Sequence, residues 1–404
     1  MENLKYELED ESRKGARIKV VGVGGAGSNA VGRMYEDGLS GVEFYVMNTD
    51  AQALAACRVP NKLQIGARIT GGLGAGSNPE VGRQSALEDT ETILDILEGA
   101  DMVFVTAGMG GGTGGGAAPV VARLARQLDA LTIAIVTRPF GFEGGRRMAQ
   151  AELAIAELAA SVDILTTIPN EQLLRVAPRG TSMPQAFRIA DDVLRQAVEG
   201  ISELILIPGL INLDFSDIRA AISNMGRALI GMATASGPDA AMQAARGAIS
   251  SPLLEDTRIQ GARQILMNIC GSQEIGLHEV SEACSIVREA SGSPDLQLNF
   301  GVITRPEMGD TVKVTVIATG FPDLREITVP AIEALPAAEF FAPREPGAAG
   351  VPFAQQLAHP EAEFVPEPAR APDQASDAAI TAAQAAWEDE LDVPAYLRQG
   401  KLVG

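Results

Sequence analysis

The chain has 404 residues, a formal net charge of -20 and only two His. The acidic surplus argues against a nucleic-acid-binding protein, because phosphate binding depends on surplus Lys and Arg. Three distant cysteines (Cys57, Cys270 and Cys284) predict neither a disulfide framework nor a zinc site, and the scarcity of His nearly excludes Ser-His-Asp triads and multi-histidine metal sites.

The amino-terminal segment is charged and lacks an apolar core, so it predicts no signal peptide. No window approaches the roughly 18 apolar residues that a membrane span needs. We therefore expect a cytoplasmic protein, with residues 1–16 as an extension ahead of the first domain.

Short apolar runs alternate with amphipathic segments through residues 17–182. The predicted strands are 17–23, 43–48, 101–107, 131–137 and 163–168. Helical spacing falls between most of these runs, for example at 80–97 and 146–160. Strands that alternate with helices indicate a parallel sheet covered on both faces. This range is therefore predicted to be an α/β domain.

A long helix is predicted for residues 183–208, opened by Ser182 and Pro184. Its apolar stripe consists of Phe187, Ala190, Leu194, Ala197, Ile201 and Leu204. Outside that stripe lie Asp191, Arg195 and Glu199. A second α/β domain is predicted at 209–322, and its strand candidates are 264–270, 296–304 and 311–319.

The composition changes after the second domain. Residues 336–404 hold 11 acidic and 4 basic residues, together with nine of the 23 prolines. Pro, Ala and Glu without periodicity cannot bury enough apolar surface to offset the entropy of ordering, so 323–375 is predicted to be a disordered linker. Within the tail at 376–404, residues 376–398 regain helical spacing and end in an aromatic and acidic peptide.

Three glycine-rich loops precede predicted helices. The first, residues 22–29, directly follows the first strand, and the second, residues 108–116, has seven glycines in nine positions. The third is 71–78. Glycines let a backbone approach a phosphate closely, and a helix N-terminus adds N–H donors and a positive dipole. Two such loops at the carboxyl ends of strands in one sheet indicate two nests of backbone amides around one polyphosphate.

Neither main loop contains Lys, and the sequence has no GxxxxGK[ST] motif, so these loops do not form a Walker-type P-loop. The phosphate charge would then be offset by backbone dipoles and a divalent cation. The first loop alone fits dinucleotide binding equally well, with Asp50 as the acid after the second strand. A tight strand-to-helix turn without a ligand is the remaining alternative.

Nine motifs, in order from Lys19 to Phe321, together resemble the FtsZ family, the bacterial tubulin-like GTPases of cell division. They are GVGGAGSNA, MNTDAQAL, GLGAGSNPEVGR, GMGGGTGGGAAPV, RPFGFEGGRRM, IPNEQLL, PGLINLDFSDI, AISSPLLED and VTVIATGF. The terminal LDVPAYLR resembles that family's adaptor-binding peptide. This similarity implies a tubulin-like fold: a Rossmann-like GTPase domain, a long central helix and a second α/β domain.

The resemblance also implies an activity and partners. The chain is expected to bind GTP or GDP with Mg²⁺, to polymerise head to tail with itself, and to act in the division ring at mid-cell. Membrane-tethering adaptors and division regulators are expected to bind Leu391–Arg398. The acids beside that peptide make direct membrane insertion an unfavourable alternative.

By resemblance, the guanine nucleotide is held by nineteen residues. They are Gly24, Gly25, Ala26, Asn29, Gly74, Ala75, Gly76, Gly110, Gly111, Gly112, Thr113, Gly114, Gly115, Gly116, Glu143, Arg147, Asn170, Phe187 and Asp191. A carboxylate at Asp191 can accept from guanine N1–H and N2–H together, which adenine does not offer. Four simpler interpretations stay open: a Glu143–Arg147 surface pair, an Asp191–Arg195 surface pair, a core role for Phe187 and a helix cap at Asn170.

The resemblance assigns catalysis to Asn212, Asp214 and Asp217, although acids at a helix start commonly just cap it. If Asp191 touches the base, Asp214 lies roughly 30 Å away along a mostly continuous helix. These acids would then reach the nucleotide of a neighbouring subunit, which builds an open filament. Their expected role is to orient the attacking water while Mg²⁺ offsets charge on the phosphates.

Some positions depart from the family pattern. Gly115 replaces a Thr and is expected to remove a hydroxyl near the nucleotide, Gly145 replaces a common basic residue, and 232–246 lacks the usual charges. A slow or paralogous family member would show such changes. Two other functions remain as alternatives: an NAD(P)-dependent oxidoreductase that uses Asp50, and a nucleotide-binding scaffold that assembles without hydrolysis.

Overall fold

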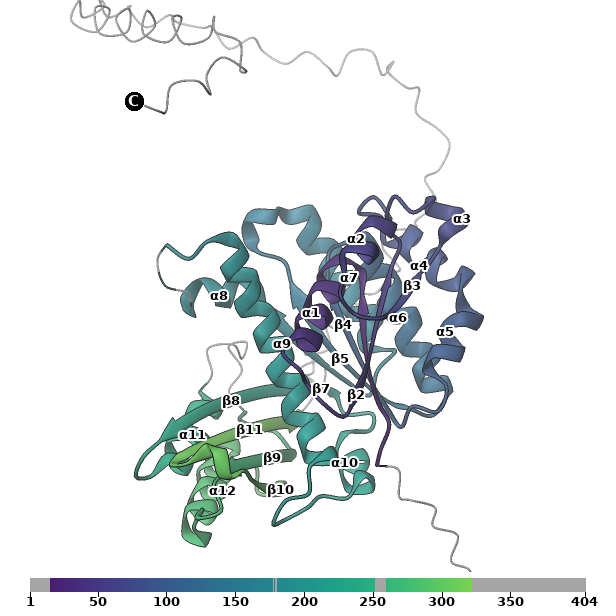
Figure 1. Cartoon of the computed structure of the whole chain (residues 1–404). Coiled ribbons are helices and arrows are strands. Elements are labelled where there is room, and N and C mark those ends of the chain that lie inside the picture. Colours follow the sequence, from purple (N-terminus) through teal and green to yellow (C-terminus); the bar gives the residue numbers. More distant parts are fainter. Residues whose placement is uncertain (1–14, 177, 179, 251–258, 322–404) are drawn as a thin grey trace, which may run out of the picture. The chain divides into compact units, whose positions relative to one another are not determined.

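The computed structural model describes residues 15–176, 178, 180–250 and 259–321. Seven strands form a parallel sheet in the order β3-β2-β1-β4-β5-β6-β7 (Figure 1). They are β1 (Ile18–Val23), β2 (Val42–Asn48), β3 (Asn61–Gln64), β4 (Met102–Gly108), β5 (Leu131–Arg138), β6 (Ile164–Pro169) and β7 (Gly226–Arg227). The predicted α/β class with a parallel sheet is confirmed.

Helices connect these strands. They are α1 (Gly24–Glu36), α2 (Ala51–Ala56), α3 (Ala67–Thr70), α4 (Pro79–Glu88), α5 (Thr90–Leu97), α6 (Gly112–Gln127), the 3₁₀ turn η1 (Gly141–Glu143), α7 (Gly145–Ala159), α8 (Asn170–Val176), α9 (Met183–Leu206) and α10 (Phe215–Ile222). Side chains of α1 and α9 pack on one face of the sheet, and those of α4, α5, α6 and α7 pack on the other. The sheet is therefore buried on both faces, as its continuous apolar strands require.

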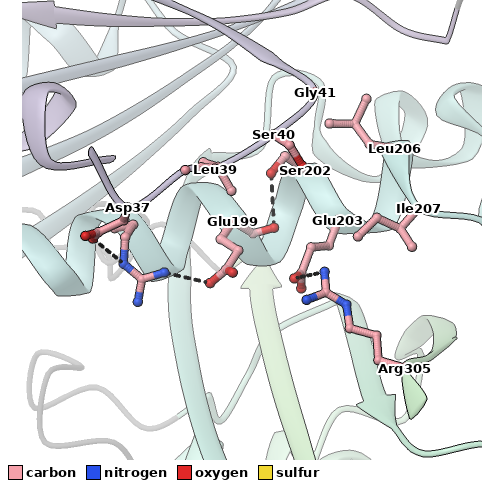
Figure 2. Close-up of a pocket in the computed structure, with 12 residues that line it drawn as sticks. Asp37, Leu39, Ser40, Gly41, Glu199, Ser202, Glu203, Leu206, Ile207 and Arg305 are labelled. Carbon is pink, nitrogen blue, oxygen red and sulfur yellow. Dashed lines mark hydrogen bonds and ion pairs between the residues drawn. The ribbon is translucent and has the colours of Figure 1, made fainter. Parts of the chain in front are cut away.

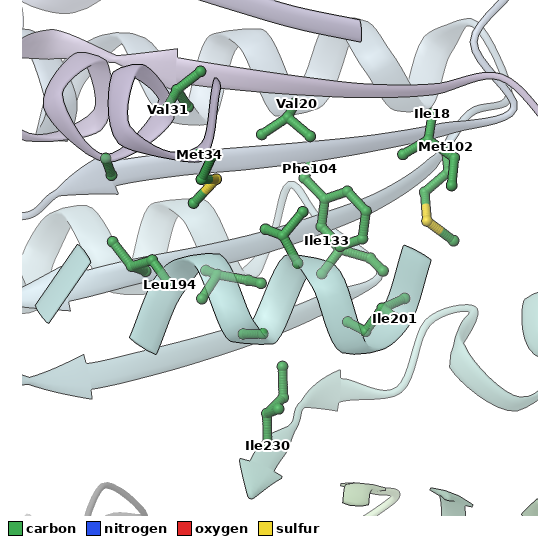
Figure 3. Packing of buried hydrophobic residues seen from close by; sticks show 14 of the residues in the cluster. Ile18, Val20, Val31, Met34, Met102, Phe104, Ile133, Leu194, Ile201 and Ile230 are labelled. Carbon is green, nitrogen blue, oxygen red and sulfur yellow. The ribbon is translucent and has the colours of Figure 1, made fainter. Parts of the chain in front are cut away.

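The long helix α9 joins the two halves of the described chain. Figure 3 shows Phe104 and Ile133 of the first sheet facing Leu194 and Ile201 of α9, with Ile230 of the second sheet on the far side of the helix. These five side chains belong to one buried cluster. Because α9 shares this core with both sheets, its two ends have fixed positions relative to the strands.

The second sheet has four strands in the order β10-β9-β11-β8, with β10 and β9 parallel and the other pairs antiparallel. They are β8 (Leu229–Ser236), β9 (Gln264–Gly271), β10 (Gln297–Thr304) and β11 (Thr311–Thr319). The 3₁₀ turn η2 (Pro306–Met308) joins β10 to β11, and α11 (Ala240–Ile249) and α12 (Leu277–Ser291) cover the sheet. No described helix has the length and apolarity needed to cross a membrane.

Two predictions of local structure are wrong, and three strands were missed. The single helix at 80–97 is two helices, because Asp89 leaves helical geometry (φ -106°, ψ 26°) and its Oδ2 accepts a hydrogen bond from Gly66 N at 2.7 Å. Phe187 is 41% exposed and does not belong to the buried stripe of α9. The strands β3, β7 and β8 were not predicted, and β3 and β7 are short and rich in polar residues or Gly.

Several predicted segments lie outside the described residues. They are most of the extension at 1–16, the linker at 323–375 and the tail at 376–404. The predictions for them, including the peptide Leu391–Arg398, stay predictions from sequence.

Candidate nucleotide site

The three glycine loops meet at the carboxyl ends of β1, β2 and β4. A Cβ added at Gly24, whose φ is +73°, would lie 2.8 Å from Gly114 N, so the first and second loops touch through backbone atoms. A Cβ at Gly112 would lie 2.8 Å from Asn78 N, which brings the third loop against the second. Glycine is required at these two positions because the backbones approach too closely for any side chain.

The N-termini of α1 and α6 both open onto this junction. Neither helix has a side-chain cap: the N-cap residues are Val23 and Gly111, and neither supplies a hydrogen bond from its side chain. Their first-turn N–H groups and their positive dipole ends are therefore available to an anion. Gly25, Ala26 and Asn29 are exposed on the first turns of α1.

The second loop also includes Gly110 and Gly115. Gly110 lies against α7, because a Cβ added there would meet Arg147 O at 2.6 Å. Gly115 is buried, and a Cβ there would lie 3.4 Å from the Cβ of Ala154 on α7. A threonine in place of Gly115 would therefore direct its side chain toward α7. The expectation that Gly115 removes a hydroxyl near the nucleotide stays a prediction from sequence.

A further residue of the second loop, Gly116, packs against the start of α4, where its Cβ would meet Pro79 O. Ala75 of the third loop is buried and lies next to Gly112, whereas Gly74 and Gly76 adopt positive φ values of +89° and +58°. These contacts make α4, α6 and the third loop one packed unit. The three loops are therefore held in fixed positions relative to one another.

Asp191, predicted to recognise guanine, lies on α9 with its side chain 12% exposed. Its carboxylate pairs with Arg33 of α1, and not with Arg195 as the simpler interpretation assumed. Arg195 binds Asp192 instead, at 2.7 Å. Burial raises the pKa of Asp191 to about 6, while the charge of Arg33 opposes that shift. Arg33 is a residue that the sequence analysis missed.

Two further predicted residues lie near the start of α8 and α9. Asn170 is buried, and its Oδ1 has no hydrogen-bond partner among the described residues. A buried acceptor without a partner is costly, so it fits a site completed by a ligand better than a helix cap. Phe187 is half exposed and makes an edge contact with Phe140, with ring centroids 5.9 Å apart. The exposed part of its side chain is available for contact with a ligand.

Glu143 and Arg147 form the ion pair that the simpler interpretation anticipated. Arg147 Nη1 lies 2.9 Å from Glu143 Oε2, while Phe140 N donates to Glu143 Oε1 at 2.7 Å. The Arg147 side chain is 51% exposed and can turn toward a ligand. The pair is adjacent to the second loop because Gly110 packs against Arg147.

The residues predicted to be catalytic lie away from the glycine loops, after the end of α9. Asn212 Oδ1 accepts a hydrogen bond from Gly209 N at 2.5 Å, and Ile211 pairs with Val302 of β10 in an antiparallel bridge. Asp214 occupies the N-cap position of α10, but its side chain makes no capping bond. Asp214 and Asp217 are both exposed and have no side-chain partner within the described chain.

The separation of these acids from Asp191 was predicted on the basis of a nearly continuous helix. That basis needs correction, because α9 ends at Leu206 and the catalytic segment lies on a separate turn anchored to β10. The helix still rises about 22 Å between Asp191 and Leu206. Figure 1 places α8 at one end of α9 and α10 at the other. The acids and the glycine loops are therefore at opposite ends of α9.

Asp50 was the acid on which the NAD(P) alternative depended. Its Oδ1 accepts hydrogen bonds from Gln52 N (2.9 Å) and Ala53 N (3.0 Å), so it caps α2. A ribose would have to compete with these two bonds. The strand order itself does not distinguish the alternatives, since dinucleotide-binding folds share the order 3-2-1-4-5-6.

A metal ion would need ligands from the nucleotide. Among the described residues, no three His, Cys, Asp or Glu side chains come close enough together to hold one. The open amide groups suit phosphate oxygens, which are themselves the ligands that Mg²⁺ prefers in nucleotide sites. The residues present therefore fit a nucleotide directly and a cation through that nucleotide.

A separate pocket of about 330 Å³ lies between the segment after α1, the carboxyl half of α9 and Arg305 (Figure 2). Arg195 and Glu199 line it beside Asp37, and Glu203 pairs with Arg305 at 2.8 Å. The glycine loops do not contribute to its lining. It therefore belongs to the contact between the two halves of the chain and not to the nucleotide site.

Comparison with known proteins gives matches over both halves of the chain. A model of the Tubulin/FtsZ family, GTPase domain, matches residues 17–178, and one of the FtsZ family, C-terminal domain, matches 226–322. An empty FtsZ dimer from M. jannaschii is 40% identical, with a TM-score of 0.70 over 76% of this chain and 88% of that one. A point mutant of FtsZ from M. jannaschii is also 40% identical, with a TM-score of 0.71 over 76% and 92%.

A more distant structure shares the fold. It is CetZ2 from Haloferax volcanii, described as a GTPγS-bound protofilament, and it is 22% identical with a TM-score of 0.66. The alignment covers 76% of this chain and 94% of that chain.

Proposed function

Because the chain belongs to the FtsZ family of tubulin-like GTPases, we propose that it hydrolyses GTP at a site shared by two adjacent subunits of a head-to-tail filament. It is a GTP hydrolase of a polymerising family. The observation that carries the shared site is the exposure of Asp214 and Asp217 at the far end of α9 from the glycine loops. Such acids cannot reach their own nucleotide, but they can reach one bound to the next subunit.

Apolar side chains at both ends of the molecule support this contact. Leu210 and Ile211, beside the acids, are 67% and 41% exposed, and Leu73 and Phe142, beside the glycine loops, are 87% and 65% exposed. Exposed apolar groups on two different surfaces fit a heterologous contact, which repeats and builds an open filament. Assembly would cover both surfaces at once.

We assign the nucleotide contacts as follows. The first-turn N–H groups of α1 and α6 bind the phosphates, with Glu143 and Arg147 at the ribose and phosphates. Asp191 accepts from guanine N1–H and N2–H, and Asn170 supplies its free Oδ1. Phe187 packs on the base. Arg33 also donates to this carboxylate, and its two oxygens have enough lone pairs to accept from Arg33 and guanine together.

Hydrolysis uses a water oriented by the incoming subunit. Asp217 and Asp214 would accept hydrogen bonds from that water and so direct its lone pair toward the γ-phosphorus. Asn212 fixes the turn by holding Gly209. Mg²⁺ would offset charge on the phosphate oxygens. The bridge between Ile211 and Val302 keeps this segment in a constant position relative to the second sheet.

The cellular role is a finer proposal, since the relatives reported above come from M. jannaschii and Haloferax volcanii. We propose that the chain forms the division ring at mid-cell in the cytoplasm. Its domains would be the GTP-binding unit at 17–182, the central helix at 183–208 and the second unit at 209–322, as the sequence indicates.

The shared site is tested by mixing subunits. Asp217→Ala keeps every glycine loop, so it should bind GTP like wild type and assemble, while GTP turnover falls about 10²–10⁴-fold. Wild type titrated with this variant should lose activity per wild-type subunit, because each site needs a loop from one chain and a nucleotide from another. Phosphate release measures GTP turnover, and sedimentation measures assembly.

Asp295→Ala, which changes another exposed acid, serves as the control and should leave activity per wild-type subunit constant. If the Asp217→Ala mixtures behave like this control while both chains co-sediment, catalysis is completed within one chain.

The tail is proposed to recruit partners and not to build the filament. Leu391, Val393, Pro394, Tyr396 and Leu397 form a short apolar peptide of the kind that docks into a partner's groove. Removing 376–404 should leave GTP-dependent sedimentation unchanged and abolish binding to membrane-tethering adaptors. Loss of assembly in the shortened chain would contradict this division of roles.

A further inference from the structure

Thr49 makes a buried contact with the second glycine loop. It follows β2 directly, and its Oγ1 lies 2.7 Å from Oγ1 of Thr113, in the first turn of α6. The two residues are 0% and 9% exposed. Within the described residues, this hydroxyl is the one partner of Thr49 Oγ1. The short distance and the burial make it a specific interaction between β2 and the phosphate-binding helix.

The surroundings of Thr49 leave it little freedom to move. Its carbonyl oxygen accepts from Gly74 N at 3.3 Å and from Thr70 Oγ1 at 3.3 Å, so the third glycine loop is fixed to its backbone. Thr113 also lies close to the first loop, because a Cβ added at Gly24 would lie 3.3 Å from the Thr113 Cβ. Thr113 is thus enclosed by Thr49 and by the first loop.

Hydroxyl chemistry decides the direction of the hydrogen bond. A hydroxyl has one hydrogen to donate and can accept two, and a phosphate oxygen only accepts. If Thr113 donates its hydrogen to a phosphate, its oxygen can accept from Thr49 but cannot donate to it. Two hydrogen bonds in sequence also polarise each other, which strengthens the outer one.

We propose that Thr49 is a positioning residue that orients the Thr113 hydroxyl toward the nucleotide phosphates. This inference rests on the proposed assignment of Thr113 to the phosphate site. It adds a residue outside all three glycine loops to the recognition of the phosphates. The ligand chemistry is that of a nucleoside diphosphate or triphosphate. The affinity for a nucleoside without phosphates should not depend on Thr49.

The test is a double-mutant cycle with Thr49→Val, Thr113→Val and the double variant, each measured for binding of GDP and of guanosine. Each single change should weaken GDP binding roughly threefold to tenfold, the usual effect of one hydrogen bond. In the Thr113→Val background, Thr49→Val should cause no further loss of GDP affinity, because Thr49 acts through the Thr113 hydroxyl. Guanosine affinity should stay constant in all variants.

Two further variants separate orientation from structural damage. Thr49→Ser keeps the hydroxyl and should restore GDP binding. Thr106→Val is the matched control, since Thr106 is a buried Thr of β4 whose Oγ1 has no hydrogen-bond partner in the described chain, and it should leave binding unchanged.

Each contrary result has a distinct meaning. An equal loss of GDP and guanosine binding in Thr49→Val, or additive effects in the cycle, would overturn the inference by showing a general structural role. Normal GDP binding in Thr113→Val would overturn both the inference and the proposed phosphate assignment. Normal binding in Thr49→Val alone would overturn the inference and leave that assignment in place.

Discussion

The carboxylate of Asp191 combines burial with a nearby cation, and its charge state decides what it can recognise. Burial raises its pKa from 3.8 to about 6, even though the Arg33 guanidinium favours the ionised form. An ionised carboxylate can accept from both guanine donors, whereas a protonated one cannot do so fully. Base recognition at this residue should therefore depend on pH close to neutrality.

The first residue-scale prediction concerns GDP binding between pH 7 and pH 5. Because the free protein takes up a proton at Asp191 below about pH 6, binding must release it, and GDP affinity should fall by up to about tenfold per pH unit below that value. Asp191→Asn carries no such proton and corrects for titration of the nucleotide itself. Fluorescence titration measures GDP affinity at each pH. If the affinity changes with pH in the same way in wild type and in Asp191→Asn, the assignment of Asp191 to guanine is contradicted.

The same shift has a consequence for the ligand-free fold. Between the unfolded value of 3.8 and the folded value of about 6, the folded chain holds a proton that the unfolded chain has released. The free energy of unfolding should therefore decrease as pH rises through this range, which is the sign expected for a raised pKa. Bound nucleotide should offset this loss of stability, because guanine supplies hydrogen-bond donors to the ionised carboxylate.

At the scale of elements, the sequence predicts best those segments whose signals are local. The strand β1 and the loop after it are visible as an apolar run that meets glycines. The start of α9 is visible in Ser182, where Ser182 N donates to Gln185 Oε1 at 3.0 Å in the folded chain. Capping and periodicity depend only on neighbours in the chain, so they can be read without the fold.

Elements that depend on distant partners could not be predicted. The break at Asp89 exists because its carboxylate binds Gly66, 23 residues earlier. The short strand β3 gains its pairing from β2, and its polar side chains give no strand signal. In both segments, a tertiary contact overrides the local pattern.

The candidate site divides in the same way. Its glycine loops and the acids of α10 were found through motifs, but the pairs that use side chains from separate elements were not. Arg33 and Asp191 are 158 residues apart, and Thr49 and Thr113 are 64 apart. Nothing in the sequence joins such residues, because only the folded sheet and α9 bring them together.

At the scale of the whole described chain, a row of alternating charges connects its two halves through α9, and Figure 2 shows its members Asp37, Glu199 and Glu203. Arg195 binds Asp37, after α1, at 3.4 Å and Glu199 at 3.1 Å. Lys313 of β11 binds Glu199 at 3.1 Å and Glu203 at 3.4 Å. This charge row fixes α9 between the nucleotide-binding half and the second sheet.

Glu203 is the most enclosed member of the charge row, with its side chain 4% exposed. Burial raises the pKa of its carboxyl, the charge of Glu199 adds to that shift, and Lys313 and Arg305 oppose it. Removing one cation from such a group leaves a charge that water cannot reach. Losing a cation beside Glu203 should therefore lower the free energy of unfolding more than losing an exposed ion pair.

The prediction at this scale is that Lys313→Met lowers the free energy of unfolding at pH 7.5 by about 2–3 kcal/mol. Breaking a buried pair costs more than its net attraction, and the partial exposure of Lys313 reduces the loss. Urea unfolding followed by circular dichroism measures it. Lys62→Met, which changes an exposed Lys, should stay within about 0.5 kcal/mol of wild type.

The origin of this loss can be tested by pH. Without Lys313, the pKa of Glu203 should rise further, because a charge that lowers it has gone. As pH falls from 7.5 toward 5, the folded variant then takes up a proton at Glu203 before the unfolded chain does, and the deficit relative to wild type should shrink. Adding Glu203→Gln to Lys313→Met should likewise recover part of the stability at pH 7.5. A deficit that is constant with pH and unaffected by the second change would mean that Lys313 stabilises the chain through packing alone.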